Sequence, residues 1–94
     1  MSVVEYKNLI AFHPSYYLKE ILECSSLTEE QIATSLNVPL EELKQWLDGE
    51  IRTTRKLADK LELEFSVTAK TWLNLQKRYD KQLLKIKNLQ KNIL

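Results

Sequence analysis

The two side chains best suited to nucleophilic or metal chemistry each stand alone in the sequence. His13 is the only histidine and Cys24 is the only cysteine. A catalytic nucleophile needs a neighbouring base, and a zinc site needs three or four ligands at suitable spacing. A histidine beside Pro14, at a predicted helix entry, is expected to pack or cap. Cys24 ends an apolar helix and is predicted to be a small buried hydrophobe. With a single glycine the chain also lacks a glycine-rich phosphate loop. We therefore expect no enzymatic activity, no metal and no cofactor.

A different chemistry, hydrogen bonding to the edges of DNA bases, is within reach of four residues on a helix predicted at residues 39–48. Gln45 can pair with adenine, and Lys44 can bind guanine or a phosphate. Leu40 could contact a thymine methyl group, and Glu41 could accept a hydrogen bond from the N4 amine of cytosine. Three basic residues that follow the helix are predicted to contact the DNA backbone: Arg52, Arg55 and Lys56.

The charge of the same region opposes strong DNA binding. Residues 28–50 contain one basic residue, Lys44, against six acidic ones: Glu29, Glu30, Glu41, Glu42, Asp48 and Glu50. Phosphates repel unpaired carboxylates. Carboxylates at helix N-termini also stabilise the helix dipole, and both effects can hold together at some loss of DNA affinity. Residues 51–94 have the opposite excess, with eleven Lys or Arg against four acidic residues.

The stretch from Thr28 to Gly49 has the spacing of a helix-turn-helix, which would position these side chains. Thr28 and Gln31 form a capping box at the start of the first helix. Asn37 tolerates the left-handed conformation that the turn requires, and Pro39 can begin the second helix. Six apolar residues form the predicted inner stripes of the two helices: Ile32, Ala33, Leu36, Leu43, Trp46 and Leu47.

Three further helices are predicted around this motif. One follows Pro14, a second is capped by Thr53 or Thr54, and a long one is capped by Thr68. Residues 1–12 are expected to be an extended or irregular lead. The predicted fold class is therefore all-α, with about five helices.

The last helix carries an apolar seven-residue repeat. Trp72, Tyr79, Ile86 and Ile93 recur at this interval. The distal half of so long a helix is expected to have no core of its own, so the stripe should meet another copy, another domain or a partner protein. The predicted dimer or partner interface consists of Trp72, Leu75, Tyr79, Leu83 and Ile86. The lysine-rich opposite faces are either solvated or attractive to an acidic partner or nucleic acid.

Size and composition agree with a small intracellular domain. The 94 residues can bury only a limited core, which makes dimerisation plausible. We find no signal peptide and no transmembrane span in the sequence, and a lone cysteine fits the reducing cytoplasm. We expect a lead at 1–12, a helix-turn-helix domain at 13–80 and a helical extension for dimerisation or linkage at 81–94.

Three segments resemble the HigA-type antitoxins, or plasmid-maintenance antidotes, of the Xre (lambda-repressor-like) helix-turn-helix superfamily. They are HPSYYLKEIL, TEEQIATSLNVPLEELKQWLDG and TWLNLQKRYD. The resemblance covers about residues 8–82. His13-Pro14 and the segment from Trp72 to Gln76 are fairly specific to this branch, whereas the middle segment is typical of Xre proteins in general.

This resemblance implies a homodimer that forms through the C-terminal helix and binds a palindromic double-stranded DNA operator. Such proteins repress their own operon and neutralise a HigB-type mRNA endonuclease toxin. The groove-facing positions fall on Leu40, Glu41, Lys44 and Gln45. Relatives usually carry small polar and basic residues around these positions, and a glycine in the following loop, where this chain has Ile51-Arg52-Thr53.

Two alternatives remain open at the level of the sequence. The domain could be a protein-interaction module with weak DNA binding. The lead KNLIAFHP and the basic tail also resemble a variant in which this module precedes an ImmA/IrrE-type metallopeptidase domain, and the chain would then be the N-terminal part of a longer regulator.

Overall fold

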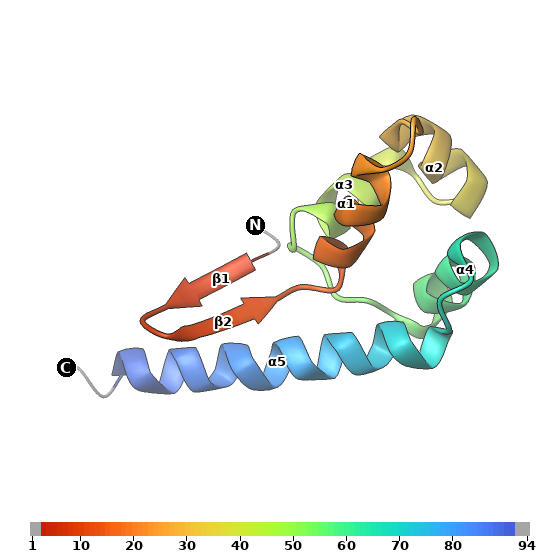
Figure 1. Ribbon diagram of the computed structural model, residues 1–94. Coiled ribbons are helices and arrows are strands. Elements are labelled where there is room, and N and C mark those ends of the chain that lie inside the picture. Colours follow the sequence, from red (N-terminus) through yellow and green to blue (C-terminus); the bar gives the residue numbers. More distant parts are fainter. Residues whose placement is uncertain (1–2, 92–94) are drawn as a thin grey trace.

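Residues 3–91, the part that the computed structural model describes, form a β-hairpin followed by five α-helices (Figure 1). The elements are β1 (Val3–Tyr6), β2 (Leu9–Phe12), α1 (Ser15–Glu23), α2 (Glu29–Leu36), α3 (Leu40–Leu47), α4 (Arg55–Phe65) and α5 (Ala69–Lys91). The predicted helical fold class and the approximate helix positions are confirmed. The hairpin is an addition, because the sequence alone indicated only an extended or irregular lead.

The predicted caps of the helix-turn-helix are present. Gln31 N–H donates to Thr28 Oγ1 over 3.1 Å, and Thr28 N–H donates to Gln31 Oε1 over 2.9 Å, which completes the capping box. Asn37 ends α2 in the left-handed conformation with φ of 56°, and Gly49 follows α3 with φ of 77°. These two positions fix the turn between α2 and α3 and the exit from α3.

One core holds the helical domain together. The indole of Trp46 is fully buried in it and lies 6.1 Å from that of Trp72, between ring centroids. The apolar stripes of four helices and the start of α5 surround this pair: Leu18, Ile32, Ala33, Leu36, Leu43, Leu47, Leu57, Ala58, Leu61 and Ala69. Burial of this apolar surface provides the main driving force for the fold and fixes α3 against its neighbours.

A second, smaller cluster forms where the hairpin lies along the distal half of α5 (Figure 1). The strands pair antiparallel, with Val4 opposite Ala11 and Tyr6 opposite Leu9. These four side chains pack against α5 around three residues: Tyr79, Leu83 and Ile86. Because the pleat alternates, one face of the hairpin supplies all four contacts.

The hairpin corrects the prediction that the distal half of α5 lacks a core within the chain. Within the single chain, Tyr79 is 9% exposed and Ile86 is 1% exposed. Ile93, the last member of the predicted repeat, lies outside the described residues. Among residues 3–91, no helix is long and apolar enough to cross a membrane.

Candidate nucleic-acid interface

The outer side of α3 brings together the four predicted base-reading residues. Glu41, Lys44 and Gln45 are exposed, and Leu40 is half-buried against the core. They share one side of the helix because the opposite side is anchored in the core by three residues: Leu43, Trp46 and Leu47. This arrangement leaves the polar side of α3 exposed to a ligand as large as double-stranded DNA.

Carboxylates occupy the first turn of both helices of the motif. Glu29 and Glu30 begin α2, and Glu41 and Glu42 begin α3. Negative charge is favourable at a helix N-terminus, where backbone N–H groups have no partner within the helix. The same carboxylates reduce the positive potential that would attract phosphates, so net charge does not favour DNA on this side of the domain.

Two of the three predicted backbone-contact residues form ion pairs within the chain. Arg52 holds Asp80 of α5 with Nη1 2.9 Å from Oδ1 and Nη2 2.8 Å from Oδ2. Burial raises the pKa of the Asp80 carboxyl, but hydrogen bonds from Arg52 and Gln76 outweigh this effect, and the pKa lies below its ordinary value. Arg55 pairs with Asp59 one turn along α4, at 3.1 Å. The third, Lys56, is exposed.

A chain of hydrogen bonds ties the loop after α3 to α5. Trp46 Nε1 donates to Thr53 Oγ1 over 2.9 Å, and Thr53 N–H donates to Gln76 Oε1 over 2.9 Å. Gln76 Nε2 in turn donates to Asp80 Oδ1 over 3.0 Å. Thr53 and Gln76 are both buried, so each of these bonds satisfies a polar group that has left water. The loop is therefore held at a fixed distance from α5.

His13 holds the same loop from the other side. Its Nε2 lies 2.8 Å from the carbonyl oxygen of Ile51, and its Nδ1 accepts a hydrogen bond from Ser15 N–H over 3.1 Å. This pattern assigns the ring proton to Nε2 and leaves the imidazole neutral. Burial lowers the pKa of His13, partly offset by the bond to Ile51. The ring also packs edge-on against Trp46 and Tyr79, with centroids 5.8 and 5.2 Å apart.

The predicted structural role of His13 is thus confirmed, and its reason is now visible. The His13-Pro14 and Trp72-to-Gln76 segments are far apart in the sequence, yet His13 and Gln76 bond to backbone groups two residues apart in one loop. That loop directly follows α3. The sequence pattern identified both segments, but it did not predict that they bond to the same loop, because nothing in either local pattern indicates a shared partner.

The five predicted interface residues divide into two groups. Trp72, Tyr79 and Ile86 are buried within the single chain, which corrects their assignment as a surface awaiting a partner. Leu75 and Leu83 are half-buried.

The prediction for Cys24 was also wrong, because this cysteine is exposed just beyond the end of α1. The apolar stripe of α1 turns Leu18 inward, and the helix ends before it can bury Cys24.

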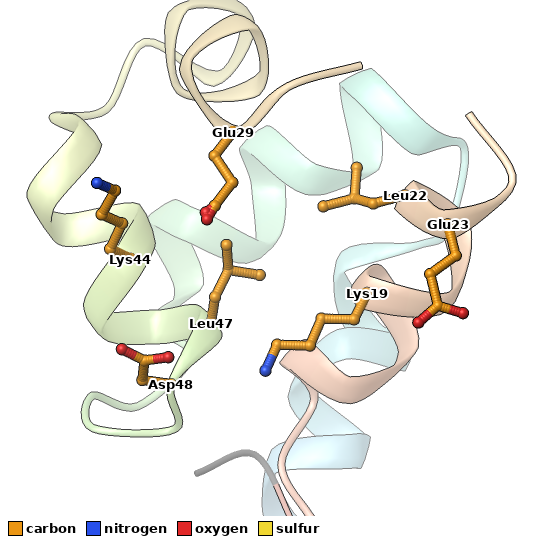
Figure 2. A pocket seen from close by; sticks show the side chains of 7 residues that line it. All are labelled: Lys19, Leu22, Glu23, Glu29, Lys44, Leu47 and Asp48. Atoms are coloured by element: carbon orange, nitrogen blue, oxygen red, sulfur yellow. The ribbon is translucent and has the colours of Figure 1, made fainter. Parts of the chain in front are cut away.

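A groove of about 400 Å³ lies beside the candidate interface, between α1, α2 and α3 (Figure 2). Leu22 and Leu47 form its apolar part, and the remaining lining residues carry charges of both signs: Lys19, Glu23, Glu29, Lys44 and Asp48. Lys44 borders both the groove and the outer side of α3. No group of three His, Cys, Asp or Glu side chains that could hold a metal occurs in the part of the chain that the structure describes.

The fold and the exposed side of α3 define a helix-turn-helix protein with the architecture of the HigA-type antidotes. An addiction-module antidote protein of the HigA family from Coxiella burnetii is 29% identical, with a TM-score of 0.77 over 86% of this chain and 89% of its own. The predicted resemblance to this group is therefore confirmed. No protein-family model matches the chain, and no curated protein sequence matches it.

Two further structures share the fold. A Pseudomonas aeruginosa protein in complex with its operator DNA is 22% identical, with a TM-score of 0.79 over 86% of both chains. The antitoxin GraA is 21% identical, with a TM-score of 0.80 over 88% of this chain and 90% of its own. At these identities the two likenesses concern the fold alone.

Proposed function

We propose that this protein is a DNA-binding transcription regulator of the HigA antitoxin type, which binds its own operator as a homodimer through α3. The observation that carries the proposal is the exposed set of Glu41, Lys44 and Gln45 on a helix anchored by Trp46. The bonds of His13 and Gln76 hold the loop that follows α3. A recognition helix must be held in this way to read bases, because a bidentate contact needs well-defined geometry.

The proposal also covers the cellular compartment of the protein and its lack of enzymatic activity. As a regulator of transcription the protein acts in the cytoplasm and catalyses no reaction. By analogy with the Coxiella burnetii antidote, it would also neutralise a toxin, for which we propose a HigB-type mRNA endonuclease.

The direct experiment is binding to a duplex from the protein's own promoter at low salt, measured by fluorescence anisotropy. Gln45→Ala should weaken binding to this duplex by about 1–3 kcal/mol and relax the preference at one base pair. Gln90→Ala removes the same amide from an exposed position on α5 and serves as the matched control. Absence of binding to any promoter duplex, or an equal effect of both variants, would contradict the proposal.

A second candidate function is supported by the acidic residues of the motif. Glu30, Glu41 and Glu42 are exposed in the first turns of α2 and α3, and such carboxylates suit a basic protein partner. Under this alternative the domain holds a toxin or another protein with little affinity for DNA. Co-purification of an untagged partner that is unaffected by Lys44→Glu, together with no operator binding, would favour it.

A further inference from the structure

Five basic side chains gather on the side of α5 that faces away from the core, and we call this set the basic stripe. It consists of Lys70, Lys77, Arg78, Lys81 and Lys85, all of which are exposed. At 3.6 residues per turn they fall within an arc of about 100°. The buried residues Trp72, Tyr79 and Ile86 lie on the opposite side of the helix, so the stripe cannot be covered by the core or by the hairpin.

The basic stripe is not neutralised by the rest of the described chain. Among residues 3–91, no side chain forms a salt bridge with any of its five members. The one acidic residue of α5, Asp80, lies on a flank of the helix and is held by Arg52. Two cations near the helix-turn-helix are more constrained: Arg55 pairs with Asp59, and Lys60 bonds to the carbonyl oxygen of Asn37.

Helix stability alone does not account for this pattern. A solvated helix face gains stability from opposite charges four residues apart, whereas like charges at that spacing repel. Lys77, Lys81 and Lys85 stand at successive intervals of four residues, which is the unfavourable arrangement. A cluster of cations along one helix, without interspersed carboxylates, is instead the electrostatic pattern of a surface that binds phosphates.

We propose that the basic stripe binds the phosphate backbone of double-stranded DNA without regard to sequence. Lys70 and Lys85 are about 23 Å apart along the helix axis, a length that spans roughly seven phosphates of one strand. Helix α5 lies across the core from α2 and α3 (Figure 1), and the stripe is on the side of α5 opposite its buried residues, so its contacts are additional to those of α3. This inference rests on the proposed function for its choice of DNA. Because the stripe and α3 lie on opposite sides of the core, the stripe binds a different stretch of duplex from the one that α3 would read.

The experiment compares two variants of equal net charge. Lys81→Gln/Lys85→Gln removes two cations of the stripe, and Lys7→Glu replaces one exposed cation at the hairpin turn, outside the stripe, with a carboxylate. Both changes lower the net charge by two units. Binding to a duplex of unrelated sequence is measured over a range of salt concentrations. The stripe variant should lower the affinity severalfold and reduce the slope of log K against log salt by about 2, since each lost phosphate contact removes about 0.9.

The control variant should leave the slope almost unchanged. An equal loss of DNA affinity in both variants would overturn the inference, because the net charge of the protein rather than the stripe would then govern binding. Binding of polyglutamate as tightly as the duplex would also overturn it, in favour of an acidic protein partner. Circular dichroism of each variant verifies that α5 is intact.

The same measurements separate this inference from the proposed function. If the stripe variant binds like the parent protein while Gln45→Ala loses the promoter duplex, the inference fails and the proposed function stands. If the parent protein binds unrelated duplexes through the stripe but prefers no promoter duplex, the proposed function fails and the inference about the stripe stands. If the parent binds no duplex at all, both fail.

Discussion

His13 shows how a single side chain can join several parts of this molecule. It follows β2, precedes α1, bonds to the loop after α3 and packs against Tyr79 of α5. All of these contacts suit a neutral imidazole. Protonation at Nδ1 would place a second N–H against Ser15 N–H, which already donates to that nitrogen. The structural role of His13 therefore depends on its protonation state.

The pH dependence of stability should reveal this role. Because burial lowers the pKa of His13 in the native state, the unfolded state binds more protons between that pKa and about 6.5. The contribution of neutral His13 to the free energy of unfolding is therefore complete above about pH 6.5 and is lost as the pH falls below it. Urea unfolding at pH 7.5 and 5.5 measures this loss.

The variant His13→Gln should destabilise the protein by about 1–3 kcal/mol at pH 7.5, since it disturbs buried hydrogen bonds. It should also reduce the difference between the free energies of unfolding at pH 7.5 and pH 5.5. The interpretation would be wrong if the variant retained the full pH dependence of the parent protein.

At the scale of elements, the hairpin and α5 depend on each other. A two-stranded hairpin is marginal in water, and it needs an apolar surface to pack against. The distal half of α5 provides that surface through Tyr79, Leu83 and Ile86. In return, the hairpin gives this half of the helix the core that the sequence pattern failed to reveal.

Two neighbouring residues of β2 test this dependence. Leu9 packs against α5, whereas Ile10 points to the other face and is 39% exposed. Leu9→Ala should destabilise the protein by about 1–2 kcal/mol, because the site is only partly buried, and Ile10→Ala should cost less. Amide hydrogen exchange should accelerate around Tyr79 to Ile86 in Leu9→Ala alone. Equal protection of these amides in both variants would contradict the packing role of the hairpin.

At the scale of the whole molecule, charge is divided between two regions. The helix-turn-helix is acidic, and the chain from Ile51 onward is basic. The molecule is also elongated, with principal extents of 46, 23 and 22 Å, because α5 runs beyond the helical core. Under the proposed function, this division means that α3 would approach DNA against its own carboxylates.

Removing those carboxylates should strengthen DNA binding. Glu41→Gln/Glu42→Gln should raise the affinity for duplexes of any sequence by roughly two- to fivefold per charge at low salt, and the gain should shrink as salt screens the repulsion. Glu5→Gln, an exposed change on the hairpin, is the control and should have little effect. A loss of promoter binding in the double variant would mean instead that Glu41 makes a specific base contact.

Local patterns in the sequence were sufficient for much of this protein. Thr28, Gln31, Asn37 and Gly49 predicted the motif correctly, since caps and turns depend on residues only a few positions apart. The inner residues of α2 and α3 followed from helical spacing, which left Lys44 and Gln45 outward. The HigA-type resemblance was likewise drawn from short segments, and the similarity in fold to a HigA-family antidote supports it.

Only the tertiary structure decided how distant segments meet. The pairing of Arg52 with Asp80 and the bonds from His13 and Gln76 to one loop join residues 23 to 38 positions apart. The strands of the hairpin are only four residues long, which is too short for their alternating pattern to be recognised in the sequence. Their packing on α5 buries Tyr79 and Ile86, whereas the sequence pattern shows only that these two residues are apolar. Helical periodicity shows which side of a helix avoids water, but the surface that covers that side is a property of the folded chain.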